Sequence, residues 1–313
     1  MLDIAIYSLP GETQFSQFVQ QDNGAAKFYL KSFQKNFRTH VFQGKAVKTS
    51  LENLDIELSK HQDAESQMTP SFHEQMVLKG IEFSKAFGGK IVLSRWQDFE
   101  VAFNVKDLLQ KLRLKFPNAF IYVVKFNDEV WLGATPETLV VKEKSSFKTM
   151  SLAGTKWENQ PFEEKEFEEQ SVVTESILEK LKNYHPSATD AYEYQYGAIR
   201  HLRSDIAWNA SASLLEIGEV LHPTPAICGH PEELSYQKIL ELEQYNRGLY
   251  TGFIGVEDVN ENGQLFVNLR CMQLFRDRIR FYAGGGVNAK SIPSVEWEET
   301  NRKMNSVLEV LSI

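Results

Sequence analysis

The chain has 313 residues, of which 42% are hydrophobic and 24% charged, and its formal net charge is −8. This composition is typical of a globular protein, and no run of about 18 apolar residues indicates a membrane span. No cluster of Lys and Arg forms the basic face that nucleic-acid binding needs. Cys228 and Cys271 form no CxxC pair, which argues against a disulfide framework or a zinc site. Asp3 and the break at Pro10–Gly11 do not fit a signal peptide, so we expect a cytoplasmic protein.

The first 70 residues have the less regular pattern, and they end in a polar stretch, Ser59–Thr69, that predicts a surface loop. The next elements, in chain order, are a helix, a strand, a second helix and a hairpin: Ser71–Phe87, Lys90–Arg95, Val105–Phe116, and Ala119–Phe126 with Glu129–Leu132. Gly88–Gly89 suits the C-cap of the first helix, and Pro117 ends the second.

The second half of the chain alternates long helices with short strands. Its predicted helices are Phe162–Asn183, Leu234–Gln244 and Ser294–Leu311, and its predicted strands are Phe253–Val259, Gln264–Leu269 and Arg278–Ala283. Because neighbouring strands are joined by short turns, we predict an α+β fold of large, mainly antiparallel β-sheets with helices packed outside. No linker rich in Gly, Ser or Pro divides the chain, so we expect a single domain over residues 1–313.

Two predicted helices carry acidic faces. Glu166 and Glu169 are three residues apart in one helix, and Glu296, Glu299 and Lys303 follow the i, i+3, i+7 spacing of one face in the last helix. If the two faces met, a cation would have to bridge their carboxylates, and oxygen ligands suit Mg²⁺. The alternative is that both faces are solvated, with an ordinary ion pair between the last two of these residues.

Lys90 and Glu137 are candidates for acid–base chemistry. Lys90 begins an otherwise apolar strand, where burial would lower its pKa and make it a general base. Glu137 follows Pro136 and could point into a cleft as a general acid. The alternatives are a lysine that snorkels at the edge of a sheet and a glutamate in the first turn of a helix.

A run of glycines, Gly284–Gly286, follows a predicted strand. Successive N–H groups there could bind a carboxylate, and Arg270, at the end of a neighbouring strand, could clamp one. A tight turn and a surface arginine are the alternatives. Neither the GxGxxG nor the P-loop pattern is present, and His201 and His222 have no triad or HExxH context.

Taken together and in this order, eight stretches of the chain resemble the chorismate-utilising enzyme family. The resemblance runs from about Phe72 to the C-terminus and implies that family's fold. The stretches are Lys90–Arg95, Gly133–Glu137, Leu152–Thr155, His201–Ser204, His222–Gly229, Arg270, Tyr282–Gly286 and Glu296–Thr300. The resemblance also implies a catalytic core over residues 71–313 and a shortened N-terminal part over residues 1–70.

Carried over position by position, the resemblance implies that Lys90 is the general base and Glu137 the general acid. Four glutamates would hold Mg²⁺: Glu169 and Glu299 directly, and Glu166 and Glu296 through waters. The substrate carboxylates would be bound by Arg270, Gly284 and Lys303, with help from Thr155 and the Tyr282 backbone. The remaining substrate contacts would be made by Ala226 and Ile227, which line the ring pocket, and by His201, which lies near the metal-bound carboxylate.

Three features place the chain beside the isochorismate synthases, which are isomerases. Lys90 resembles the base that activates water, Ala153 stands where aminodeoxychorismate synthases carry a nucleophilic lysine, and His222–Ala226 is similar to the loop of isochorismate synthases. A salicylate synthase is the nearest alternative, and a non-catalytic chorismate-binding protein is a second. One departure is Gln170, where the family often has histidine.

The resemblance implies chorismate as a small-molecule substrate, with Mg²⁺ as cofactor. We expect no nucleic-acid or membrane partner, and a monomer. The product would feed menaquinone or siderophore biosynthesis, and we favour menaquinone.

Overall fold

The computed structural model describes residues 2–60, 68–157, 161–196 and 199–311. Its strands, in chain order, begin with β1 (Leu2–Ser8), β2 (Phe15–Gln20), β3 (Ala26–Lys31), β4 (His40–Thr49), β5 (Lys90–Glu100), β6 (Phe120–Phe126), β7 (Glu129–Thr135), β8 (Thr138–Glu143) and β9 (Ser146–Trp157). The later strands are β10 (Ser187–Ala188), β11 (Tyr192–Tyr196), β12 (Ile199–Asn209), β13 (Gly229–His230), β14 (Phe253–Glu257), β15 (Gly263–Val267), β16 (Cys271–Leu274) and β17 (Arg278–Val287).

These strands form one continuous hydrogen-bonded sheet in which the described pairings are antiparallel. From one edge to the other, the strands pair in the order β13, β5, β17, β16, β7, β6, β1, β2, β4, β3, β14, β15, β8, β9 and β12, and β10 and β11 pair with β12. The prediction of mainly antiparallel sheets is therefore confirmed.

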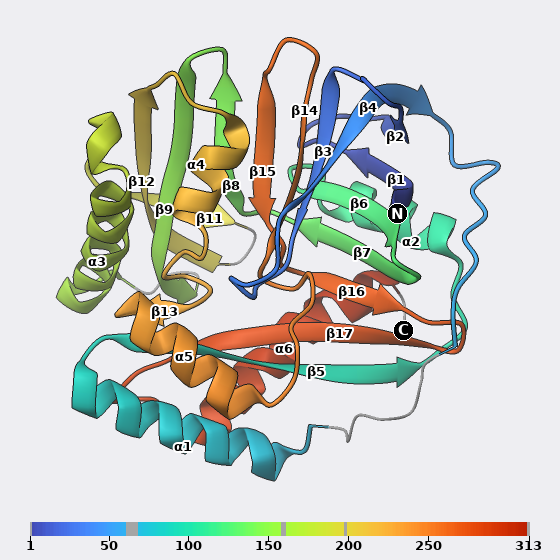
Figure 1. The fold of residues 1–313 in the computed structure, drawn as a ribbon. Coiled ribbons are helices and arrows are strands. Elements are labelled where there is room, and N and C mark those ends of the chain that lie inside the picture. The colour runs from blue at the N-terminus through green and yellow to red at the C-terminus, as the bar shows by residue number, and fades with distance from the viewer. Residues whose placement is uncertain (1, 61–67, 158–160, 197–198, 312–313) are drawn as a thin grey trace.

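The sheet folds over so that its two halves face each other. Figure 1 shows one half of the sheet, β3, β14, β15, β8, β9 and β12, running upright. The strands β5, β17, β16 and β7 of the other half lie beneath and beside them and run across their direction. The space between the halves holds an aromatic core, in which Phe120 stacks on Phe266 at 4.6 Å between ring centroids and Trp131 stacks on Tyr282 at 5.2 Å. This folding brings the two ends of the sheet, far apart in the order of pairing, to the same side of the molecule.

Helices cover the outer surfaces, as predicted. They are α1 (Pro70–Phe87), α2 (Val105–Lys115), α3 (Glu164–Lys180), α4 (Leu214–Leu221), α5 (Glu232–Glu243) and α6 (Pro293–Leu311). The apolar faces of α2 and α6 pack on the β6–β17 half, α3 and α4 pack on the β8–β15 half, and α1 and α5 pack beside β5. Within the described ranges, no helix is long and apolar enough to cross a membrane.

One local expectation was wrong, and one alternative is excluded. Gly284–Gly286 do not follow a strand but lie within β17, where they pair with Val92, Leu93 and Ser94 of β5. The alternative of Glu137 in the first turn of a helix does not hold, since this residue lies in the short connection between β7 and β8. In both places the neighbouring strand supplies backbone partners that no local pattern could reveal.

Residues before 70 hold more regular structure than their pattern indicated. Strands β1 to β4 lie there, and they pair with β6 on one side and β14 on the other. Of the predicted loop Ser59–Thr69, residues 61–67 lie outside the described part of the chain. Thr69 is the N-cap of α1, because its side chain accepts a hydrogen bond from the Phe72 amide.

Candidate active site

Lys90 lies at the start of β5, where two strands hold its backbone. β13 pairs with Lys90 and Ile91 on one edge, and β17 pairs with the rest of the strand on the other. The side chain is 20% exposed, and its Nζ lies 3.3 Å from Oε1 of Glu169 on α3. The side chain passes over Gly286, since a Cβ at that glycine would meet Lys90 Cδ at 3.6 Å. The amine of Lys90, which belongs to a strand at one end of the sheet, therefore lies beside α3.

Glu137 faces the same region from the connection between β7 and β8. Its carbonyl accepts a hydrogen bond from the Val267 amide at 2.9 Å, which fixes the backbone. Burial raises the pKa of the carboxyl from 4.5 to about 7, and the positive charges of Lys90 and Lys303 oppose part of that rise. A carboxyl with this pKa can hold a proton near neutral pH and release it during a reaction.

Two carboxylates of α6 lie against Gly285 of β17. A Cβ at Gly285 would lie 3.2 Å from Oε2 of Glu296 and 3.5 Å from Oε1 of Glu299. The pKa of Glu296 is raised, first by burial and then by the negative charge of Glu299 beside it, although a hydrogen bond from Ser291 and the charge of Lys303 oppose this rise. Among the described residues, Oε2 of Glu296 is buried and has no hydrogen-bond partner. The missing side chain of Gly285 thus leaves room for both carboxylates.

Lys303, one turn beyond Glu299, connects α6 to β17. Its Nζ lies 2.7 Å from Oε1 of Glu299 and donates to the Gly284 carbonyl at 2.7 Å. The sequence prediction of one face for Glu296, Glu299 and Lys303 agrees with these contacts. The alternative of an ordinary i,i+4 ion pair is also realised, because the last two of these residues are paired.

His201 and Arg270 approach the same group of charges. The pKa of His201 is lowered, chiefly by burial and then by the positive charges of Arg270 and Lys303, whereas the charge of Glu169 raises it. His201 therefore stays neutral near pH 7 and can donate or accept one hydrogen bond at each nitrogen. Its strand, β12, lies at the opposite end of the sheet from β5, so the fold of the sheet brings these residues together.

The other predicted site residues differ in their contacts and in their burial. Oε1 of Glu166 lies 3.2 Å from Lys156 Nζ, and its Oε2 accepts from the Glu163 amide in a capping box at the start of α3. Tyr282 is buried, and its ring stacks on the rings of Trp131 and Tyr250. Ile227 is buried and Ala226 is partly exposed, whereas the side chain of Thr155 lies outside the described residues.

The carboxylates suit a magnesium ion in their chemistry. In the described part of the chain, no group of three or more His, Cys, Asp or Glu residues could by itself hold a metal ion. Mg²⁺, however, is usually bound through one or two carboxylates and keeps several waters. The unpartnered Oε2 of Glu296, the adjoining carboxylate of Glu299 and the space over Gly285 fit such an ion.

A sequence model of one family, described as chorismate binding enzyme, matches residues 15–312. The chain belongs to this family. It is 32% identical over 247 residues to the isochorismate synthase EntC of Escherichia coli strain K12, and 30% identical over 247 residues to the vibriobactin-specific isochorismate synthase of Vibrio cholerae serotype O1. Each alignment covers 72% of this chain and 62% of the relative, so the chain spans less than two thirds of these curated relatives.

A solved structure supports the fold assignment. The menaquinone-specific isochorismate synthase MenF from Escherichia coli superimposes with a TM-score of 0.82 at 19% identity, over 98% of this chain and 88% of that one. At this identity the likeness concerns the fold alone. It confirms the family's antiparallel sheet with helices outside, which the sequence motifs implied.

A buried ion pair that was not predicted from the sequence lies against β5, the strand that carries Lys90. Arg247 donates to both carboxylate oxygens of Glu243, at 2.8 and 2.6 Å, and both side chains are almost fully buried. The pair borders β5: Arg247 donates to the Val92 carbonyl at 2.8 Å, and Glu243 accepts from the Ser94 amide at 2.7 Å. The pair therefore satisfies backbone groups of β5 that would otherwise bond to a neighbouring strand. The i,i+4 spacing was a signal, but it did not indicate burial.

Proposed function

We propose that the chain is an isochorismate synthase that isomerises chorismate with the help of Mg²⁺. The observation that carries this proposal is the placing of an amine, Lys90, and a carboxyl with a pKa of about 7, Glu137, around one region that also holds the carboxylates of α6. One base and one acid are what a reaction needs when water adds at one ring carbon and hydroxide leaves another.

Lys90 and Glu137 would act at opposite ends of the allylic system. Lys90 takes a proton from water, and the water oxygen bonds to C2 of the ring. As the ring double bonds shift, the bond from C4 to its hydroxyl breaks, and Glu137 gives that hydroxyl a proton so that it leaves as water. One water enters and one leaves, so the product is an isomer of the substrate. For this role Lys90 must be neutral at the moment of attack.

The substrate is a dicarboxylate and the protein is acidic, so local positive charge is needed for binding. Glu169 and Glu299 would hold Mg²⁺, with Glu166 and Glu296 acting through waters, and the ion would supply charge that neutralises the ring carboxylate. Arg270 and Lys303 would pair with the second carboxylate, since their charges reach His201 in the same region.

We propose that the whole chain works as a single domain and a cytoplasmic monomer. The pairing of β1 with β6 and of β3 with β14 supports one domain, because it joins residues before 70 to the sheet that carries the site. Relatives named for siderophore and menaquinone synthesis are both similar to this chain, and we favour the menaquinone route.

Chromatography of the products from chorismate tests the function directly. With Mg²⁺ we expect isochorismate, no free pyruvate and no change when ammonium is added. A chelator should stop the reaction, and added Mg²⁺ should restore it. Salicylate with pyruvate would identify a salicylate synthase instead, and an aminated product with ammonium would exclude water as the nucleophile. Failure to consume chorismate in the presence of Mg²⁺ would contradict the assignment.

A further inference from the structure

Helix α3 meets the surroundings of Lys90 at two places. Near its start, Glu169 contacts Lys90 Nζ at 3.3 Å. Lys180, the last residue of the helix, follows eleven residues later, which is close to three helical turns. The two side chains therefore project from nearly the same face of the helix, about 16 Å apart along its axis.

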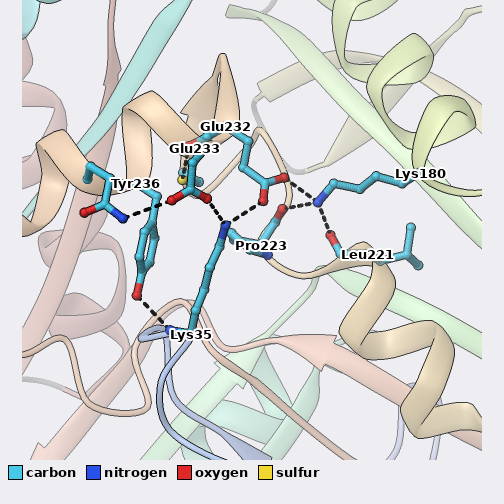
Figure 2. Close-up of polar contacts among 9 residues, drawn as sticks. Lys35, Lys180, Leu221, Pro223, Glu232, Glu233 and Tyr236 are labelled. Atoms are coloured by element: carbon cyan, nitrogen blue, oxygen red, sulfur yellow. Dashed lines mark hydrogen bonds and ion pairs between the residues drawn. The ribbon is translucent and has the colours of Figure 1, made fainter.

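The amine of Lys180 is bound by three acceptors. Figure 2 shows its Nζ between the carboxylate of Glu232 and two backbone carbonyls. The distances are 2.5 Å to Glu232 Oε2, 2.7 Å to the Pro223 oxygen and 3.1 Å to the Leu221 oxygen. An ammonium group has three protons to donate, so these contacts use all of them. The side chain is 19% exposed, so solvent does not substitute easily for these partners.

The Leu221 carbonyl ends α4, and the Pro223 carbonyl lies in the connection between α4 and β13. This connection, residues 222–228, carries Ala226 and Ile227, and it ends at Gly229 and His230, which pair with Ile91 and Lys90. Gly229 lies so close to β5 that a Cβ there would be 2.3 Å from the Lys90 carbonyl. Lys180 thus fixes one end of a segment whose other end is hydrogen-bonded to the backbone of Lys90.

The same carboxylate binds a second lysine. Oε1 of Glu232 lies 3.1 Å from Lys35 Nζ, and Glu233 lies 2.8 Å from that nitrogen. The backbone amide of Lys35 donates to the Tyr236 hydroxyl at 2.7 Å, so within the described residues the polar contacts of Lys35 run to α5 (Figure 2). Lys35 therefore shares the charge environment of Lys180 but does not bond to the 222–228 connection.

We propose that Lys180 is a positioning residue that ties the end of α3 to the 222–228 connection. It thereby fixes the positions of Glu169 and Ala226 relative to Lys90. This inference rests on the proposed function. The helix contacts Lys90 through Glu169 and the connection through β13, and, among the described residues, Lys180 supplies the hydrogen bond that joins helix and connection. Loss of that link should let the two walls of the site move apart without removing any group that touches the substrate.

The test compares Lys180→Met with Lys35→Met, because both changes remove one cation from Glu232. The wild-type protein is first shown to convert chorismate, so that failure of the function is seen before any variant is made. For Lys180→Met we expect the KM for chorismate to rise about tenfold, with kcat changed less than about threefold. Calorimetric titration should show weaker Mg²⁺ binding as well. For Lys35→Met we expect both quantities within about twofold of wild type.

Lys180→Arg supplies a rescue experiment. Because arginine keeps the charge and the hydrogen-bond donors, we expect its KM to lie between those of Lys180→Met and wild type. Melting temperatures of the variants separate positioning from unfolding. If Lys180→Met does not fold, Lys180→Gln replaces it, because its neutral amide cannot supply the three donors of the ammonium group, and the same rise in KM is expected. The proposal is overturned if the KM and the Mg²⁺ affinity of the folded variant match wild type, or if Lys35→Met changes them equally.

Discussion

The two parts of strand β5 use polar residues in opposite ways. Around Ser94 the polar groups are satisfied: the amide and hydroxyl of Ser94 donate to Glu243 at 2.7 and 2.8 Å, and Arg247 completes the group. Arg95, on the other face, stacks on Trp297 at 3.8 Å and donates to Thr300 at 2.7 Å, which fastens α6. This part of the strand is a structural anchor.

Around Lys90 the polar groups are poorly satisfied. Glu137 has a raised pKa, and Oε2 of Glu296 is buried without a hydrogen-bond partner among the described residues. When ionised, such groups lower the stability of the folded chain, and they are typical of functional sites, whereas a fully bonded network rigidifies the fold. The same strand therefore gains stability from one part and reactivity from the other. Changes at Lys90 should therefore affect turnover, and changes at Arg247 should affect stability.

The largest expected effect is the loss of turnover in Lys90→Ala. Without the amine no group takes the proton from water, so kcat should fall by about 10²–10⁴-fold. The melting temperature should stay close to that of wild type, because the partly exposed amine pairs with Glu169 alone among the residues that the structure describes. Kinetics and thermal unfolding measure both quantities. Near-normal activity in the purified variant would show that the base is another group.

Arg247→Met should give the opposite result. Removing the guanidinium leaves the carboxylate of Glu243 buried without its counter-charge, which costs about 3–5 kcal/mol of unfolding free energy. Denaturant unfolding measures this loss. At low temperature, where most of the variant is still folded, we expect only a small loss of activity. The control is Lys238→Met on α5, the helix that ends at Glu243, because the partly exposed pair of Lys238 with Glu241 contributes less than about 1 kcal/mol. Equal stability of the two variants would contradict the structural role.

The pH dependence sharpens the role of Glu137. As a general acid it must carry a proton, so kcat/KM, which reports the groups of the free enzyme, should fall as pH rises through about 7, by about tenfold per pH unit above that value. Its raised pKa also adds stability that is fully present below about pH 4.5 and is lost as pH rises through about 7. Glu137→Gln should remove both dependences. An unchanged pH profile in that variant would exclude this carboxyl as the acid.

The smallest expected effect is that of Gly285→Ala. The added methyl group would press on Glu296 Oε2 at 3.2 Å, beside its ordinary contact with Glu299 at 3.5 Å, so Mg²⁺ affinity should fall about tenfold. Gly286→Ala is the matched control, because its methyl group would make only an ordinary contact, 3.6 Å from Lys90 Cδ. Calorimetry with Mg²⁺ alone measures both affinities. Equal affinities in the two variants would show that these carboxylates do not hold the ion.

Much of the fold could be predicted because its signals are local. The helix predicted over Ser71–Phe87 is found at Pro70–Phe87, and the hairpin around Asn127–Asp128 is found as β6 and β7. Strands β1 to β4 were not assigned, because their residues depend on partners distant in the chain. The glycines of β17 were misplaced for the same reason, since β5 extends that strand through them.

The candidate site was predicted less evenly. The spacing of Glu296, Glu299 and Lys303 follows from helical geometry, so their common face could be stated from sequence. Their closeness to Gly285 could not be stated, because it depends on how α6 packs against β17. Likewise Glu166 and Glu169 share a helix, but only the structure shows that one binds Lys156 while the other meets Lys90.

The periodic elements, the antiparallel character of the sheet and, through eight ordered stretches, the family could be read from the sequence alone. Those properties are set by residues a few positions apart or by motifs that can be read one at a time. The tertiary structure decided which charged groups meet, which are satisfied and which are not. It did so because the sheet folds over and brings its two ends together, so that Lys90 of β5 lies beside α3, and burial then sets the pKa of each group that meets there.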